Sequence, residues 1–236
     1  MTSSSSVRAE ISSSNAQHRP APYKLSALLR GHTDDVRCVT ADRSSLKSTE
    51  RLASTSRDGS ARLWETTETP EGSREWRQAC EWQEGHEGYV NAARFVHLKD
   101  SGDGESVVHQ GAWSGLSTQK RRLMNLERAE YLATAGADSL IQVYNLSESP
   151  TCATNPSYTL LGHAHNVCAL DVSGNGKQIA SASWDMTARV WSWVGGEDGW
   201  NCTSVLVDHG AAVWDVLLIQ KDPNILLTGT EAERHY

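Results

Sequence analysis

The chain has 236 residues, enough for one large domain or two small ones. Its 22 Lys and Arg against 29 Asp and Glu give a net charge of -7. This charge argues against a binding surface for nucleic acid or an anionic membrane, because the summed field repels phosphate. Five cysteines form no C-x-x-C pair, so we expect reduced thiols in a reducing compartment.

The N-terminal segment, residues 1–22, is rich in Ser and lacks the apolar core of a secretory signal. We expect it to be a disordered tail, followed by one domain over 23–236. Residues Tyr23 to Arg30 predict an outer strand that precedes the first repeated block.

The first block begins at a Gly-His pair that ends in His32. Three residues later Val36 opens a short alternating segment. A run of small residues then leads to Asp58, and Trp64 follows six residues after it. Period-2 alternation on both sides of Asp58 predicts two strands joined by a tight turn.

The same order of residues recurs along the chain. A buried His, a turn Asp, a hydroxyl and an aromatic polar hydrogen can satisfy one another inside a sheet. We therefore interpret the repeated positions as a structural network, and its members are His32, Asp58 and Trp64, then His86, Asp138 and Tyr144, then His163, Asp185 and Trp191, and finally His209 in an incomplete fourth copy.

This spacing resembles the WD-repeat signature of a β-propeller, in which each repeat is a four-stranded antiparallel blade. The predicted blades run from Val36 to about Gln83, from Val90 to about Leu161 and from Val167 to about Val207. A fourth begins at Val213 and includes Ile225 to Thr230. The predicted fold is therefore all-β, with about three complete blades plus part of a fourth. Open sheet edges lead us to expect aggregation of the isolated chain, or assembly with another chain.

Additions to the blades are predicted on one face only. The polar segment 99–128 is an insert in blade two, while 65–75 and 192–201 lie between third and fourth strands. Antiparallel alternation places these additions opposite the Gly-His loops and Asp turns, which are uniform in length. We favour the uniform face as the binding platform. The alternative is that loops accept insertions wherever solvent reaches them.

Catalytic and metal sites find little support. The repeated histidines each have their own blade, so we expect no metal and no cofactor. A propeller hydrolase would need a nucleophile paired with a His at the loop face. The loop positions provide only Asp35 and Arg57, so we expect that the chain is not an enzyme. Trp184 and Trp214 stand where the repeat does not demand an aromatic. They are either partner anchors or plugs of the central channel.

Several blocks go beyond the generic repeat. They resemble the N-terminal propeller of the phospholipase A-2-activating protein family, which includes the fungal ubiquitin-fusion-degradation adaptors. The resemblance covers about residues 23 to 230, apart from the insert, and the blocks that carry it are Leu29-Arg-Gly-His-Thr-Asp-Asp-Val-Arg37, Ser54-Thr-Ser-Arg-Asp-Gly-Ser-Ala-Arg-Leu-Trp64, Ser181-Ala-Ser-Trp-Asp-Met-Thr-Ala-Arg-Val-Trp191 and His209-Gly-Ala-Ala-Val-Trp-Asp-Val216.

The resemblance implies a seven-bladed ring, which at 40 to 45 residues a blade needs about 300 residues, so we expect a truncated propeller. It also implies a ubiquitin-binding adaptor in ubiquitin-dependent protein degradation and ubiquitin recycling, cytoplasmic and nuclear. The partners would be ubiquitin or ubiquitylated proteins. A AAA-ATPase segregase would be recruited only through C-terminal domains missing here. The alternative is a generic WD-repeat scaffold for another protein or peptide. The ubiquitin contacts that the resemblance implies on the loop face are Asp35, Arg37, Arg57, Tyr89, Asn91, Asn166, Trp184 and Trp214.

Overall fold

The computed structural model describes six stretches of the chain, residues 25–43, 49–83, 85–99, 130–147, 155–219 and 225–231. Within these stretches the chain forms fourteen β-strands and no helix. In the same stretches there is accordingly no helix long and apolar enough to cross a membrane. The predicted tail 1–22 and all but the first residue of the predicted insert 99–128 lie outside the described residues.

The strands form three four-stranded antiparallel sheets and one two-stranded sheet, each ordered along the chain. The first sheet contains β1 (Val36–Ala41), β2 (Arg51–Ser56), β3 (Ala61–Glu68) and β4 (Arg74–Trp82). The second contains β5 (Val90–His97), β6 (Glu130–Gly136), β7 (Ile141–Asn145) and β8 (Tyr158–Leu160). The third contains β9 (Val167–Val172), β10 (Gln178–Ser183), β11 (Ala188–Gly195) and β12 (Gly199–Leu206), and the last contains β13 (Val213–Leu218) and β14 (Leu226–Thr230).

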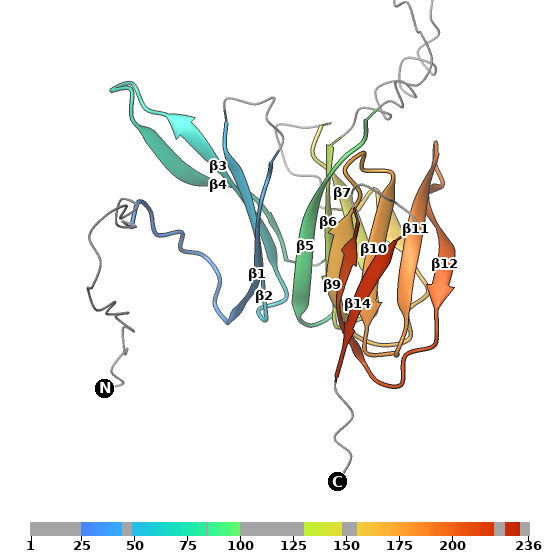
Figure 1. Cartoon of the computed structure of the whole chain (residues 1–236). Helices are drawn as coiled ribbons and strands as arrows, with labels where there is room; N and C mark the ends of the chain where they lie inside the picture. Colours follow the sequence, from blue (N-terminus) through green and yellow to red (C-terminus); the bar gives the residue numbers. More distant parts are fainter. Residues whose placement is uncertain are drawn as a thin grey trace, which may run out of the picture.

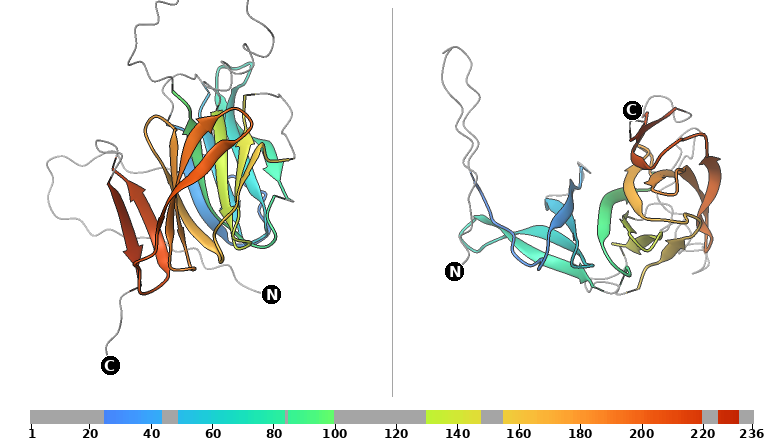
Figure 2. Two further views of the ribbon diagram at one scale, coloured as in Figure 1. Left: turned by 90° about the vertical axis from the view of Figure 1, so that its right-hand side faces the viewer. Right: turned by 90° about the horizontal axis from the view of Figure 1, so that it is seen from below.

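The four sheets are successive blades that stand side by side (Figure 1). Their first strands β1, β5, β9 and β13 contact one another in that order. Within the described residues the sheets follow an arc and do not close into a ring (Figure 2). The predicted fold class, an all-β WD-repeat propeller with three complete blades and part of a fourth, is confirmed.

Apolar side chains fill the spaces between neighbouring blades. The second strands carry small residues, and Ala53, Ala133 and Ala180 are fully buried, which lets the sheets approach closely. Larger groups fill the gaps that remain: Trp82 and Tyr144 stack between blades one and two with ring centroids 4.8 Å apart. This packing makes each blade depend on its neighbour, as expected for a repeat protein.

A buried ionic cluster also joins blades one and two, at the end of the sheets opposite the Gly-His loops. Arg51 is only 4 % exposed and donates to Asp42 and, at 2.9 Å, to Glu130. His97 Nε2 lies 2.8 Å from the Asp42 carboxylate, and the Arg51 guanidinium lies over the Phe95 ring. The repeat pattern does not contain these residues, so the sequence analysis missed the cluster.

Two expectations from the sequence are wrong in detail. Residues 25–30 of the predicted outer strand 23–30 form no strand, and residues 23 and 24 lie outside the described residues. The thiols are not all reduced, since Cys80 is disulfide-bonded while Cys38, Cys168 and Cys202 are free. In contrast, the additions 65–75 and 192–201 lie between third and fourth strands as predicted, where they extend the β3–β4 and β11–β12 hairpins.

Candidate functional site: the loop face

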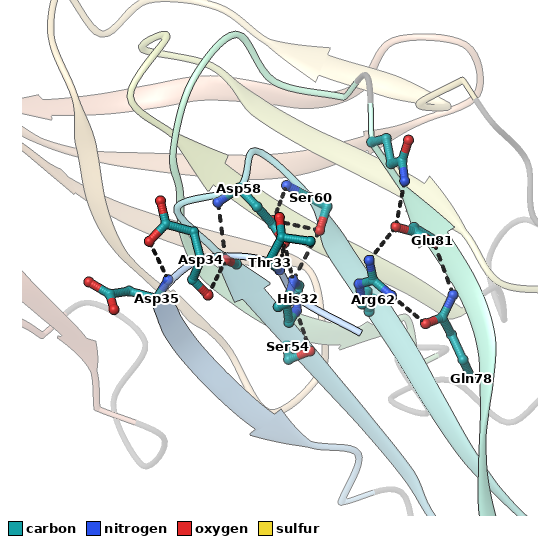
Figure 3. Close-up of polar contacts among 12 residues, drawn as sticks. His32, Thr33, Asp34, Asp35, Ser54, Asp58, Ser60, Arg62, Gln78 and Glu81 are labelled. Carbon is teal, nitrogen blue, oxygen red and sulfur yellow. Dashed lines mark hydrogen bonds and ion pairs between the residues drawn. The ribbon is translucent and has the colours of Figure 1, made fainter. Parts of the chain in front are cut away.

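The Gly-His loops and Asp turns gather at one end of the blades, the lower end in Figure 1, which we call the loop face. In blade one, Trp64 Nε1 donates to Ser54 Oγ at 2.9 Å, and Ser54 Oγ lies 2.8 Å from His32 Nε2. His32 Nδ1 completes the chain, 3.0 Å from the Asp58 carboxylate (Figure 3). The loop before the blade is thereby fixed to its second and third strands.

Blade three repeats this chain of hydrogen bonds. Trp191 Nε1 donates to Ser181 Oγ at 2.9 Å, and Ser181 Oγ lies 2.7 Å from His163 Nε2. His163 Nδ1 is 2.8 Å from the Asp185 carboxylate. Blades one and three therefore hold their loops by the same four groups.

Blade two keeps the His and Asp but changes the aromatic end. His86 Nδ1 lies 3.0 Å from the Asp138 carboxylate, and His86 Nε2 lies 2.9 Å from Thr134 Oγ1. The buried Tyr144 hydroxyl has no hydrogen-bond partner among the described residues, so its predicted membership of the polar network is wrong. Burial, with a contribution from the Asp138 charge, raises the pKa of Tyr144 to about 12. Tyr144 therefore acts by packing.

Blade four shows only half of the network. His209 Nε2 lies 2.9 Å from Thr228 Oγ1, while its buried Nδ1 has no partner among the described residues. The sequence has Ala232 where the other blades have the turn Asp, and that position is outside the described residues. Among the described residues, the loop that precedes β13 and Trp214 is therefore held by fewer of these hydrogen bonds than the loops of the other blades.

The turn carboxylates of blades one and three are strongly stabilised as anions. Burial alone would raise the pKa of Asp58, but hydrogen bonds from Ser60, Thr33 and His32 outweigh it and lower the pKa well below the ordinary value. The pKa of Asp185 is lowered in the same way, with burial opposed by hydrogen bonds from Thr187, the Ala164 amide and His163. Each carboxylate thus orders its turn and the adjoining Gly-His loop together.

A β-bulge opens the first strand of every blade, because one extra residue follows the strand-opening Val. Bulges re-aim side chains at the ends of strands, and two of these four positions are exposed while two are half-buried. The extra residues are Arg37, Asn91, Cys168 and Trp214. The resemblance singled out three of them and missed Cys168, whose thiol pKa burial raises to about 11.

Between blades one and two, a cation lies against an aromatic ring. The Arg57 guanidinium is 5.1 Å from the centre of the Tyr89 ring and 3.5 Å from the Asp35 carboxylate. Arg57 stands just before the turn Asp of blade one, and Tyr89 just before the strand-opening Val of blade two. All three residues are exposed, and Arg37 is exposed beside them in the chain. We call this group the charged half of the loop face.

Between blades two and three, the implied contact residues bind each other. Asn91 Nδ2 donates to Asn166 Oδ1 and, at 3.1 Å, to the Val167 carbonyl. Asn166 is only 9 % exposed. This pair therefore ties two blades together and offers a partner little surface.

Between blades three and four, two exposed indoles meet. Trp184 and Trp214 have ring centroids 5.2 Å apart and planes at 64°, and they remain 39 % and 46 % exposed. His165 adds a third ring, whose centroid lies 5.7 Å from that of Trp184, and its Nδ1 accepts a hydrogen bond from the backbone N–H of Asn166. We call His165, Trp184 and Trp214 the aromatic patch. The sequence analysis did not select His165, because the repeat places no particular residue type there.

The chain Asp58–His32–Ser54 has the hydrogen-bond order of a hydrolase triad. Ser54, however, is 6 % exposed, and its oxygen accepts the Trp64 indole hydrogen. The arrangement therefore serves the structure of the blade rather than attack on a substrate. Among the described residues, no three His, Cys, Asp or Glu side chains are grouped as metal ligands.

Comparison with known proteins agrees with this architecture. The family model "WD domain, G-beta repeat" matches residues 23–65 and 154–192. Protein DOA1 of Saccharomyces cerevisiae is 30 % identical over 84 % of this chain, and the phospholipase A-2-activating protein of Xenopus laevis is 31 % identical over 84 %. The chain is a WD-repeat relative of these proteins. It spans about a fifth of their length, 20 % and 19 % respectively.

Solved structures show the same fold. The WD40 propeller of Doa1 is 26 % identical, covers 85 % of this chain and 50 % of its own, and superimposes with a TM-score of 0.52. A polycomb repressive complex 2 chain of Chaetomium thermophilum has a TM-score of 0.59 at 19 % identity, covering 85 % of this chain and 38 % of its own, which shows the fold alone.

A third relative in sequence is "Ubiquitin homeostasis protein lub1" of Schizosaccharomyces pombe, which is 31 % identical over 72 % of this chain and 18 % of its own length.

Proposed function

We propose that this chain is a ubiquitin-binding adaptor and that ubiquitin or a ubiquitylated protein docks on its loop face. The observation that carries the proposal is the aromatic patch, which is exposed on an ordered rim beside the charged half of the same face. Exposed Trp and Tyr on a rigid scaffold are the side chains that most often dominate protein–protein affinity.

The names of the relatives support ubiquitin as the partner. One is named for ubiquitin homeostasis, and the others are Protein DOA1 and a phospholipase A-2-activating protein. The family resemblance in the loop blocks implies ubiquitin binding at this end of the propeller. The role would be degradation and recycling of ubiquitin conjugates in the cytoplasm and nucleus, without catalysis by this chain. Recruitment of a AAA-ATPase segregase would depend on domains beyond the propeller.

The eight implied contacts differ in exposure and in pairing, which supports some of them more than others as part of the interface. Arg37, Tyr89, Trp184 and Trp214 are exposed, whereas Asn166 is buried against Asn91. Asp35 and Arg57 are exposed but paired with each other. The proposed interface therefore centres on the exposed aromatic side chains, while the Asn91–Asn166 pair holds blades two and three together.

Direct binding tests this function. Isotope-labelled ubiquitin titrated with the whole chain and followed by NMR should show saturable shifts confined to one surface of ubiquitin. No shift at the highest soluble concentration of the chain would refute ubiquitin binding. That result would favour the alternative, a generic WD-repeat scaffold for another protein or peptide, which the WD-repeat match alone supports.

A further inference from the structure

Both halves of the loop face have more carboxylates than cations, but only one of them contains cations at all. In the charged half, the segments 31–37, 56–60 and 85–91 contain both carboxylates and arginines. In the aromatic half, the segments 162–168, 183–187 and 208–215 contain three carboxylates and neither Lys nor Arg. The three are Asp185, Asp208 and Asp215, and the last two are exposed.

The charged half already has a cation on its aromatic ring. Arg57 precedes the turn Asp of blade one and lies 5.1 Å from the centre of Tyr89 in blade two. The residue at the equivalent position of blade three is Trp184, which contacts Trp214 in blade four. At this junction the chain therefore supplies a second aromatic ring where the other junction has a guanidinium.

The geometry leaves the indoles able to receive a group from outside. Their planes meet at 64°, so neither ring can cover the whole face of the other, and each keeps more than a third of its surface exposed. A cation above an aromatic face is attracted by the ring quadrupole, most strongly by Trp. The carboxylates of these segments also favour a cation, and the segments themselves contain no Lys or Arg. One described cation that acts on these segments from outside is Arg37 of blade one, which lies close enough to influence Cys168.

We propose that the aromatic patch is a receptor for a cationic side chain, Lys or Arg, of the bound partner. Only the identity of the protein that supplies this side chain rests on the proposed function. The preference for a cation follows from the aromatic patch itself. The competing occupant is an apolar side chain, which would use the same rings without regard to charge.

A matched pair of peptides separates the two occupants. Ac-Gly-Gly-Lys-Gly-Gly-NH2 and the same peptide with norleucine, which has an uncharged side chain of similar length, are titrated into the whole chain. The indole N–H signals of the tryptophans are followed by NMR. We expect the Trp184 and Trp214 signals to move with the lysine peptide, with an affinity about fivefold higher than for norleucine. The buried Trp64 and Trp191 serve as internal controls and should not move.

Variants give the second readout. Trp184→Leu and Trp214→Leu should each abolish the preference for lysine, and Asp215→Asn should reduce it, while Trp76→Leu in the distant β4 should leave it unchanged. Equal affinities for the two peptides, or a preference for norleucine, would overturn the proposal. If the lysine preference holds but ubiquitin does not bind, the patch stands and the ubiquitin function fails. If ubiquitin binds without a lysine preference, the ubiquitin function stands and the proposal of a cation receptor fails.

Discussion

The charged half and the aromatic half of the loop face are built on the same hydrogen-bond framework but present different surfaces, one of paired charges and one of exposed aromatic rings. His32 and Asp58 hold the turn that carries Arg57, and His163 and Asp185 hold the turn that carries Trp184. In one half the exposed side chains are paired with each other. In the other the two indoles contact each other but keep much of their surface exposed. The repeat thus provides rigidity, and the few residues it leaves free determine what each half can bind.

The largest expected effect comes from removing a turn carboxylate from either half. Asp58→Ala and Asp185→Ala should each lower the free energy of unfolding by about 2 kcal/mol, because each leaves several donors unpaired. Only Asp185→Ala should also weaken ubiquitin binding, since it loosens the turn beside Trp184. Chemical denaturation and titration of the two variants measure both effects. Equal losses of affinity would show that the halves are not functionally distinct.

The pH dependence of stability should reveal the same carboxylates. Their pKa values are lower in the folded chain than in the unfolded chain, so their contribution is complete above the unfolded value near 3.8 and is lost as pH falls through the folded values. Burial also lowers the pKa of His163, and its hydrogen bond to Asp185 offsets only part of this. Stability should therefore begin to fall below about pH 6.5.

The control for this dependence is His163→Gln, which removes the titrating ring and keeps a polar side chain. Thermal unfolding between pH 7 and pH 5 should then be less pH-dependent than in the unaltered chain, although the variant is less stable overall. An unchanged slope over this range would contradict the role given to His163.

Removing the paired cation of the charged half should have a small effect. Arg57→Ala loses an exposed ion pair and an exposed contact with Tyr89, which together are worth about 1 kcal/mol or less. We expect ubiquitin affinity to change by no more than about threefold at physiological salt, mainly through the association rate. Stopped-flow kinetics at two salt concentrations measures this. A tenfold faster dissociation would place Arg57 at the centre of the interface.

The smallest expected effect concerns the residue after each turn Asp. Gly59, Ser139 and Met186 all have a positive φ, of 82°, 71° and 65° respectively. Only glycine adopts this conformation without steric cost, so Met186→Gly should raise the free energy of unfolding by about 0.5 kcal/mol. The reciprocal change Gly59→Met should lower it. A destabilised Met186→Gly variant would show that the exposed methionine side chain contributes packing that outweighs the strain.

The blades were predictable from the sequence because their information is local. His32, Asp58 and Trp64 recur at fixed spacing, and alternation around them defines the strands. Hydrogen bonding in the network was less predictable, since Tyr144 occupies the aromatic position without reaching a partner. A hydroxyl on a phenol lies elsewhere than an indole N–H, so the same position need not make the same bond.

The contacts between blades could not be derived from spacing. Arg57 with Tyr89, Trp184 with Trp214, and Arg51 with Glu130 each join residues in different repeats. Their proximity depends on the bulges and on how closely the sheets pack, which the repeat pattern does not encode. The sequence identified Trp184 and Trp214 separately, and the structure shows that they form one surface.

One measurement tests most directly whether the aromatic half is the ubiquitin-binding surface. The dissociation constant for ubiquitin is measured by isothermal titration calorimetry for the unaltered chain, the double variant Trp184→Leu/Trp214→Leu and the control Trp76→Leu. We predict that the double variant binds at least about tenfold more weakly, since interface tryptophans commonly contribute 2 kcal/mol or more. Its melting temperature and the affinity of the control should stay close to those of the unaltered chain. Unchanged affinity in a folded double variant would contradict the assignment.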